Sequence, residues 1–375
     1  MAGIYIHIPF CKKACFYCDF HFSTSLRFKD DMIDAILKEI GTQQKYLEGK
    51  TLETIYFGGG TPSLLNKEEL TLIINTVSEN FEIIENPEIT LEANPDDLTI
   101  EKLKELKAVG INRLSIGVQS FFDEHLKWMN RAHSALESEA CIKNAQEIGF
   151  QNITIDLIYG MPNLTDKQWE ENIKKALSLN APHISAYNLT VEKNTALAHF
   201  VKKGKYQPLS DEKGAKQFSY LIETLERNGF EQYETSNFAK DKQYSIHNSS
   251  YWRGKHYLGI GPSAHSYNGN SRQWNIANNK KYIDAISNNE NQFEIEKLSN
   301  ADKINEHLLI GLRTIWGCNL NFIESLATEN SYKQFMNELT VQIEKKMVTL
   351  DKNNIFLTPK GKLFADRIAS DLFVE

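Results

Sequence analysis

The first 190 residues repeat one pattern six times, a short apolar run followed by an amphipathic stretch. The apolar runs have the length and composition of β-strands and occupy residues 3–8, 54–57, 88–93, 112–118, 152–160 and 183–189. Strands that alternate with helices pair in parallel, because each helix returns the chain to the edge where the strand began. The sequence therefore predicts an α/β fold with helices outside a parallel sheet. Both an open doubly wound sheet and a barrel or partial barrel fit this pattern.

The stretches between these strands carry helix signals. Residues 28–47 repeat apolar side chains at steps of four, as one buried helix face requires. Three further helices are expected to begin at capping boxes, in which a small polar residue precedes Glu or Gln by three positions. These pairs are Asn66 with Glu69, Ser134 with Glu137, and Thr165 with Gln168.

Polar or glycine-rich segments lie at the ends of the predicted strands. They are Cys11–Cys18, Gly58–Thr61, Glu92, Gln119, Asp156 and Thr190, in strand order. Any one of them alone is explained by a turn or a helix cap. In parallel barrels, however, the carboxyl ends of the strands form the active-site face. Six such strand ends in a row therefore predict a functional site there.

Three cysteines, Cys11, Cys15 and Cys18, are spaced C-x3-C-x2-C on the segment after the first strand. Three thiolates on one loop can bind three irons of a [4Fe–4S] cluster and leave the fourth iron open for a small molecule. A structural zinc site is the alternative, with His21 as its fourth ligand. A disulfide is disfavoured, because three close cysteines leave one unpaired.

Composition limits the other function classes. The net charge of −7 argues against a nucleic-acid partner. No apolar run approaches the roughly 20 residues of a membrane span, and the first residues lack a signal-peptide pattern. Clustered cysteines fit a reducing compartment, so we expect a cytoplasmic protein. Cys141 shares an apolar helix face with Ala145 and Ile148 and is expected to pack in the core.

Several motifs together resemble a known family. The cysteine loop and FGGGTPS (57–63) resemble radical S-adenosylmethionine proteins. YIHIPFCKKACFYCDF, EANP (92–95), SIGVQSF (115–121), DLIYGMP (156–162) and LGIGPSAHS (258–266) resemble the oxygen-independent coproporphyrinogen III dehydrogenase-like branch. The resemblance covers nearly the whole chain. It implies a partial (β/α)6 TIM-like barrel, in which the cluster's open iron binds S-adenosylmethionine and a reduced cluster cleaves it to a 5'-deoxyadenosyl radical.

The resemblance also implies residue roles. It makes Cys11, Cys15 and Cys18 the cluster ligands, and it gives S-adenosylmethionine contacts to Tyr5, Tyr17, Gly59, Gly60, Thr61, Glu92, Gln119, Arg131, Asp156 and Thr190. Within this set, Gln119, Arg131 and Asp156 match a second cofactor site of the dehydrogenase, and Thr190 matches a position near adenine. The glycine run would bring backbone close to the ligand. For Arg131, a solvated surface charge is the alternative.

The chain also departs from the dehydrogenase pattern. Phe20 stands where the dehydrogenase has a further cysteine, and only ten residues precede Cys11 in place of a long arm. An H-N-x-x-Y-W motif begins at His247 and ends with Tyr251 and Trp252. These features resemble the HemW-type heme chaperones, a related branch. The resemblance implies that His247 is an axial heme ligand, since neutral imidazole commonly binds heme iron, and that Tyr251 and Trp252 contact the porphyrin.

Two function classes follow. In the first, the protein is a chaperone that carries heme as cargo to heme-accepting proteins, membrane respiratory enzymes among them. In the second, it is a radical enzyme that acts on a tetrapyrrole, such as a coproporphyrinogen III dehydrogenase. Both need an electron donor for the cluster, and both leave a homodimer open. A satisfied loop histidine is the alternative role of His247.

The resemblance divides the chain into three parts. Residues 1–200 are expected to form the barrel core, and 201–300 an extension that carries the H-N-x-x-Y-W motif. Residues 301–375 are expected to form a small α-rich, winged-helix-like domain with a single strand, used for packing or docking. The polar segment 267–300, rich in asparagine and lysine, is expected to be loop and boundary.

Overall fold

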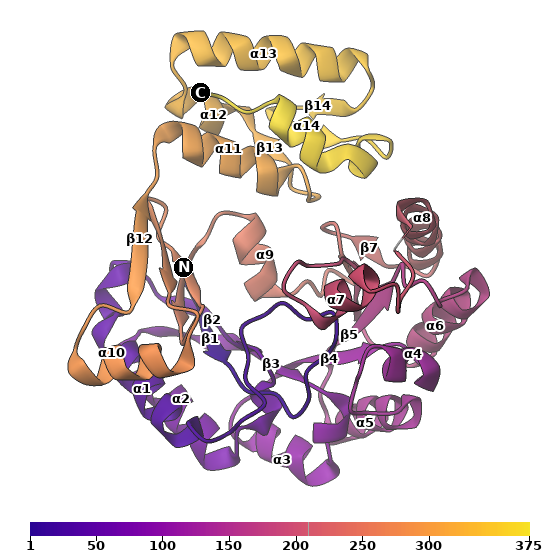
Figure 1. Ribbon diagram of the computed structural model, residues 1–375. Helices are drawn as coiled ribbons and strands as arrows, with labels where there is room; N and C mark the ends of the chain where they lie inside the picture. The colour runs from indigo at the N-terminus through magenta and orange to yellow at the C-terminus, as the bar shows by residue number, and fades with distance from the viewer. Residues whose placement is uncertain (209) are drawn as a thin grey trace.

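A twelve-stranded sheet forms the centre of the computed structural model, which describes residues 1–208 and 210–375 (Figure 1). Its middle consists of six parallel strands, as the sequence predicts: β1 (Ala2–Ile8), β2 (Leu52–Gly59), β3 (Ile83–Ala93), β4 (Arg113–Gln119), β5 (Asn152–Tyr159) and β6 (His183–Asn188). Helices cover one face of these strands: α1 (Lys29–Thr42), α2 (Lys67–Asn80), α3 (Ile100–Ala108), α4 (Asp123–Trp128), α5 (Ala135–Ile148) and α6 (Asp166–Ser178). The three predicted capping boxes form at α2, α5 and α6.

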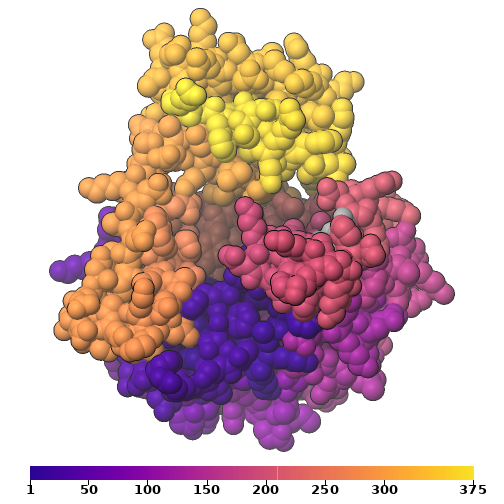
Figure 2. Space-filling model, viewed as in Figure 1, coloured from indigo at the N-terminus to yellow at the C-terminus, as the bar shows by residue number. Residues whose placement is uncertain are grey.

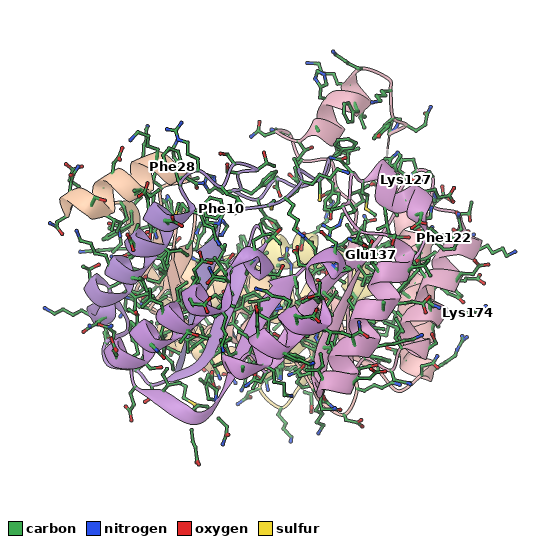
Figure 3. All side chains as sticks on the ribbon, turned by 90° about the horizontal axis from the view of Figure 1, so that it is seen from below. Phe10, Phe28, Phe122, Lys127, Glu137 and Lys174 are labelled. Carbon is green, nitrogen blue, oxygen red and sulfur yellow. The ribbon has the colours of Figure 1, made fainter. Side chains whose placement is uncertain are left out.

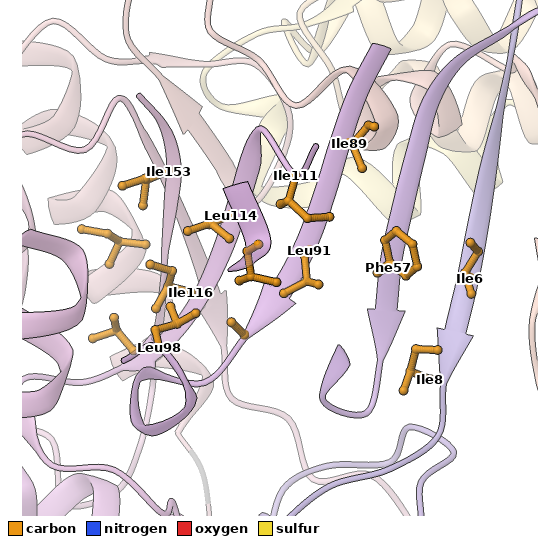
Figure 4. Packing of buried hydrophobic residues seen from close by; sticks show 14 of the residues in the cluster. Ile6, Ile8, Phe57, Ile89, Leu91, Leu98, Ile111, Leu114, Ile116 and Ile153 are labelled. Atoms are coloured by element: carbon orange, nitrogen blue, oxygen red, sulfur yellow. The ribbon is translucent and has the colours of Figure 1, made fainter. Parts of the chain in front are cut away.

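The two faces of the parallel strands differ in chemistry. Ile4, Ile6 and Ile8 of β1 are fully buried in the main apolar core, together with helix residues. Figure 4 shows the equivalent side chains of neighbouring strands, such as Leu91 and Leu114, packed in one layer. Tyr5 and His7 alternate with these isoleucines and so point to the other face. That inner face is polar. Its side chains, such as Glu92 and Asp156, line a cavity and do not pack against a second apolar layer.

The sheet does not close into a full barrel. Its strand order is β12-β11-β10-β9-β1-β2-β3-β4-β5-β6-β8-β7, so each end of the parallel region is extended by later strands. The extension comprises α7 (Ala196–Lys202), α8 (Asp211–Arg227), β7 (Glu231–Gln232), β8 (Asn237–Ala239), α9 (Ile246–Trp252), β9 (His256–Ile260), β10 (His265–Tyr267), β11 (Ser271–Asn275), α10 (Asn279–Asn288) and β12 (Phe293–Lys297). In Figure 1, α9 lies between the two ends of the sheet.

The prediction that residues 267–300 form a loop is wrong. This segment contains β11, α10 and β12, and α10 packs against α1. Glu39 of α1 is fully buried and accepts hydrogen bonds from Asn275, Gln292 and Tyr282, as well as from the Gly261 N–H. The polar composition hid these elements, because α10 buries only a short apolar face with Tyr282 and Ile286, and hydrogen bonds to the buried Glu39 carboxylate supply further anchoring.

The last part of the chain has its own apolar core, which runs from Ile304 to Val374. Its elements are α11 (Asn300–Gly311), β13 (Cys318–Asn319), α12 (Leu320–Leu326), α13 (Glu329–Glu344), β14 (Val348–Asp351), β15 (Asn354–Leu357) and α14 (Ala365–Asp371). The strands form a second sheet in the order β13-β15-β14, where the sequence predicts only one strand. The hairpin turn at 351–354 contains no glycine, and Lys352 adopts the left-handed conformation instead.

The remaining surface carries ordinary polar side chains. Figure 3 shows Lys174 of α6 at the outer edge of the molecule, directed away from the sheet. Cys141 of α5 and Cys318 of β13 are both buried, and burial of Cys141 agrees with its predicted packing role. In the described parts of the chain, no helix has the length and apolar character needed to cross a membrane.

Candidate functional site

A cavity of about 450 Å³ opens at the carboxyl ends of the parallel strands. All predicted cluster and cofactor residues except Tyr5 line it: Cys11, Cys15, Tyr17, Cys18, Gly59, Gly60, Thr61, Glu92, Gln119, Arg131, Asp156 and Thr190. We call it the strand-end cavity. Tyr5 is not among the lining residues. Its ring packs so close to Gly58 that a Cβ atom on Gly58 would lie 2.8 Å from it, and its hydroxyl hydrogen-bonds Nδ1 of His7 at 3.1 Å. The strand-end pattern of the sequence therefore brings these residues together.

The cysteine loop is held by backbone hydrogen bonds at its first residue, Cys11, and at Phe16 within it. The Cys11 N–H donates to the Ser23 carbonyl at 3.0 Å, and the Phe16 N–H donates to the Met129 carbonyl at 3.1 Å. The Leu197 N–H in turn donates to the Phe16 carbonyl at 2.7 Å, so the extension also supports the loop. The loop is thus fixed by backbone bonds that do not involve sulfur.

Two polar side chains donate hydrogen bonds to the cysteine sulfurs. Thr61 Oγ1 lies 3.4 Å from Cys11 Sγ, and Arg131 Nη1 lies 3.4 Å from Cys15 Sγ. Burial raises the pKa of the Cys18 thiol to about 12. Binding of iron has to displace such thiol protons, and donors aimed at sulfur then stabilise the thiolates. Arg131 therefore lies inside the site rather than on a solvated surface.

The described residues do not form a preorganised site for a single metal ion. Among residues 1–208 and 210–375, no three His, Cys, Asp or Glu side chains converge closely enough to hold one ion. A cubane takes one thiolate on each of three irons, so its cysteines lie farther apart than ligands of one ion. His21, the fourth ligand in the zinc alternative, instead hydrogen-bonds Asn279 through Nε2 at 2.6 Å.

Asn94 is a site residue that the sequence analysis missed. Its amide donates to Thr61 Oγ1 at 3.2 Å and accepts from Arg131 Nη2 at 2.6 Å, so it links the two residues that contact cysteine sulfur. Asn94 follows Glu92 by two positions at the end of β3. A second polar residue at that strand end was the signal that could have identified it.

Besides its predicted place near the ligand, the glycine run has a structural role. A Cβ atom on Gly60 would lie 2.7 Å from the backbone oxygens of Ile8 and Phe10. Gly59 has a φ of 104°, and a Cβ there would lie 2.5 Å from the His7 ring. Both glycines are therefore required by close approach of β2 to the segment that leads into Cys11, whatever ligand the cavity binds.

The cavity also contains polar atoms that lack protein partners. Gln119 Oε1 and Arg131 Nε are buried and make no hydrogen bond within the part of the chain that the structure describes. Gln119 also adopts a positive φ of 65°, which is uncommon for a residue with a side chain. Buried polar groups without partners carry a free-energy cost, and a polar ligand in this cavity would remove it. These atoms fit a small polar cofactor.

Two carboxyl groups lie on the inner face of the sheet. Glu92 accepts from the Tyr56 hydroxyl at 2.8 Å and from the Gly59 N–H at 3.1 Å, and burial raises its pKa. Burial and the nearby Glu92 raise the pKa of Asp156 to about 7, although the Ser115 hydroxyl donates to it at 3.2 Å. Asp156 therefore titrates near neutral pH.

Asp156→Asn is expected to stabilise the protein in a pH-dependent way. The folded-state pKa of Asp156 is raised to about 7 from 3.8, so its ionisation weakens folding progressively as the pH rises through that window. Below about pH 3.8 the carboxyl group is protonated in both the folded and the unfolded state, so its ionisation no longer lowers the stability of wild type relative to the asparagine variant. The gain in the free energy of unfolding should be larger at pH 8 than at pH 5.5 by about 2 kcal/mol, by linkage.

Chemical denaturation of protein without cofactor at the two pH values measures this gain. Asp284→Asn is the matched control, because Asp284 pairs with Lys280 on the exposed face of α10. The control should change little at either pH. An equal effect of Asp156→Asn at both pH values would contradict the argument.

The H-N-x-x-Y-W motif lies away from the strand-end cavity. His247 is buried in the barrel interior and does not line the strand-end cavity, whereas Tyr251 and Trp252 line a different cavity, of about 620 Å³. Both His247 nitrogens are occupied: Nδ1 lies 2.7 Å from Thr54 Oγ1, and Nε2 lies 2.7 Å from the Tyr251 hydroxyl. Burial lowers the pKa of His247 to about 3, so the ring is neutral.

Comparison with known proteins agrees with this architecture. Residues 5–176 match the model of the radical SAM superfamily. The chain is 35% identical over 371 residues to the heme chaperone HemW of Bacillus subtilis, covering 98% of each chain. It is 30% identical over 375 residues to the heme chaperone HemW of Mycobacterium tuberculosis strain H37Rv, covering 99% of this chain and 94% of that one.

A solved structure is similar over almost the whole chain. Coproporphyrinogen III oxidase (HemN) from Escherichia coli, described as a radical SAM enzyme, superposes with a TM-score of 0.86 at 25% sequence identity. The match covers 99% of this chain and 90% of that one, so the C-terminal part is included. The prediction of a partial barrel followed by a small C-terminal domain is thereby confirmed. On the extent and identity of these matches, the chain belongs to the radical SAM superfamily and, within it, to the family of heme chaperones named HemW.

Proposed function

We propose that this protein binds heme and delivers it to heme-accepting proteins, with the help of a [4Fe–4S] cluster and S-adenosylmethionine. The observation that carries the proposal is the similarity to heme chaperones along 98% of the chain. The strand-end cavity supports the cofactor part, because it gathers three cysteines, two sulfur-directed donors and unpartnered polar atoms on one surface.

In this proposal Cys11, Cys15 and Cys18 hold the cluster. Thr61 and Arg131 stabilise the thiolates through their hydrogen bonds to sulfur. Bound S-adenosylmethionine would supply a radical precursor and would ligate the open iron. The remaining predicted contacts, including Gly59, Glu92 and Thr190, line the same cavity and would orient that cofactor.

Three further features belong to the proposal. The proposed division at about residue 300 is supported by the separate apolar core of residues 304–374. The division at about residue 200 follows the family resemblance, since the extension shares the main sheet and core. The cluster receives its electron from a separate donor. The cytoplasm is the proposed compartment, because five cysteines without disulfide bonds are typical of proteins in reducing surroundings. The acceptors include membrane respiratory enzymes, and a homodimer is a state to test by sedimentation.

An enzymatic role is the second candidate. The structural similarity to coproporphyrinogen III oxidase favours it, since the match includes the whole barrel. Against it stands Phe20, which lines the strand-end cavity with a 68% exposed side chain at the position of the dehydrogenase's further cysteine. A large apolar ring there offers no thiol chemistry. We therefore rank heme delivery first.

Heme titration of the anaerobically reconstituted protein tests this ranking. Wild type should develop a Soret band with histidine-ligated character, and His247→Ala should lose that character while it retains its iron–sulfur cluster. Tyr251→Phe should not weaken ligation, because it frees Nε2 of His247 from its hydroxyl partner. Trp252→Ala should reduce affinity less than His247→Ala, because it removes an apolar contact and not an iron bond.

His199→Ala is the matched control, because His199 is exposed on α7. The same wild-type preparation should leave coproporphyrinogen III unconverted. Vinyl product formed over many turnovers, without retained heme, would reverse the ranking of the two functions. If the heme spectrum of His247→Ala matched that of wild type, His247 would not be the iron ligand, but the proposal that the protein binds heme would still stand.

A further inference from the structure

A second cavity, of about 620 Å³, lies in the lateral opening of the partial barrel. Residues from both ends of the sheet line it, among them Asn237 of β8 on one side and Tyr257 of β9 on the other. Helix α11 of the C-terminal part covers it through Lys303, His307 and Ile310. Figure 2 shows a hollow in this region, below the yellow C-terminal segment and between the orange and red ones. We call it the lateral cavity.

Aromatic rings form much of its wall. Trp252, Tyr257 and Tyr267 line it from the barrel side, and Phe322 of α12 lines it from the C-terminal side. The rings support one another: Phe322 lies 4.6 Å from the His307 ring, and Tyr257 packs edge-on against Tyr251 at 4.5 Å. Broad aromatic surfaces on opposite sides suit a large planar ligand, and volumes of about 300–1,000 Å³ are usual for small-molecule sites.

The polar residues of the cavity favour an anionic ligand. Arg272 is paired with Glu306, but a guanidinium has further N–H donors to offer. Lys303 donates to the Asn270 side chain at 2.9 Å and forms no ion pair within residues 1–208 and 210–375. Of the two lining carboxyl groups, Glu306 is neutralised by Arg272, and burial raises the pKa of Glu234 to about 7. The lateral cavity therefore holds excess positive charge near its C-terminal wall.

The lateral cavity also adjoins the strand-end cavity. Tyr187, at the end of β6, lines both. A ligand in the lateral cavity is therefore separated from the predicted cofactor site by this side chain, whereas it is held on its opposite side by the C-terminal part. The two cavities are thus separate but neighbouring spaces.

We propose that the lateral cavity is the heme site, with the macrocycle between the aromatic walls and the propionates against Lys303 and Arg272. The inference rests on the proposed function, and it adds a location and the residues that bind the carboxylates. It also gives the C-terminal part a role, since α11 supplies Lys303 and closes the site. His247 lies behind Tyr251, so its access to the iron would require Tyr251 to move.

Binding of heme and of heme dimethyl ester to the full chain with reconstituted cluster tests this site. The ester lacks the propionate charges but keeps the macrocycle. Lys303→Ala should weaken heme binding about tenfold, the scale of one charge-assisted hydrogen bond, and should barely affect the ester. Ile310→Trp should weaken binding of both ligands by tenfold or more, because a larger side chain fills the cavity.

Two variants on exposed positions of α13 are matched controls. Lys333→Ala removes a cation outside the cavity, and Ile343→Trp adds the same bulk at a 39% exposed position. Iron content and thermal melting check that each variant is folded. Wild-type protein that binds no heme would overturn the proposed function itself. Wild-type binding with unchanged affinities in Lys303→Ala and Ile310→Trp would overturn the lateral site alone.

Discussion

Replacing Cys11, Cys15 or Cys18 with alanine is expected to reduce bound iron from about four atoms per chain to nearly none. Each thiolate holds one iron of the cubane, and the site offers no second cysteine as a substitute, since Cys141 and Cys318 are buried elsewhere. Iron analysis and the visible absorption of anaerobically reconstituted protein measure the loss.

The barrel should survive this loss. The loop is fixed by backbone hydrogen bonds from Cys11, Phe16 and Leu197, which alanine substitutions leave in place. Circular dichroism should therefore stay close to that of wild type. Cys141→Ala is the matched control and should retain its iron, because Cys141 lies on the buried face of α5, away from the cysteine loop. Stoichiometric zinc in iron-replete, anaerobically purified protein would contradict the cluster assignment.

Arg131 offers a graded version of the same test. Its guanidinium donates to Cys15 Sγ and also to Asn94 and the Gly117 carbonyl. Because it touches sulfur without binding iron, its removal should weaken the cluster rather than abolish it. The contrast between Arg131 and the cysteines separates a positioning residue from a ligand.

The strand-end residues could be predicted from the sequence because local signals and topology agree. Capping boxes such as Ser134 with Glu137 mark where helices begin, and the alternation of strands and helices fixes a parallel sheet. In such a sheet, residues that follow successive strands must meet on one face. Cys11, Glu92 and Asp156 are far apart in the chain, yet this rule brings them to one cavity.

The lateral cavity could not be predicted in this way. Its walls come from β6, β8 and α9, from β9 to β11, and from the C-terminal part, and the mutual placement of these elements depends on tertiary contacts. The exact partners of His247 were equally hidden, since nothing local indicates that Thr54 of β2 lies beside its Nδ1. The elements within residues 267–300 are hidden for a related reason, because one of their anchors, Glu39, lies on α1 more than 200 positions earlier.

That anchor predicts a large effect on folding. Glu39→Ala is expected to lower the free energy of unfolding by at least about 3 kcal/mol, because each buried donor left without an acceptor costs roughly 1–3 kcal/mol. It leaves the Gly261 N–H, Asn275, Tyr282 and Gln292 without their shared acceptor in a fully buried site. Because domains are stable by only about 5–15 kcal/mol, this is a large fraction of the total.

Urea denaturation measures the change, and limited proteolysis within residues 267–300 should show that β11 to β12 loosen first. Glu39→Gln should lose less than Glu39→Ala. Burial raises the pKa of Glu39, so the ionised form is only partly compensated, and a neutral amide keeps one acceptor oxygen without that cost. Asp34→Ala, on the exposed face of the same helix, is the matched control and should change stability by less than about 0.5 kcal/mol. If Glu39→Ala were as stable as Asp34→Ala, the buried carboxylate would not be what holds the extension to the barrel.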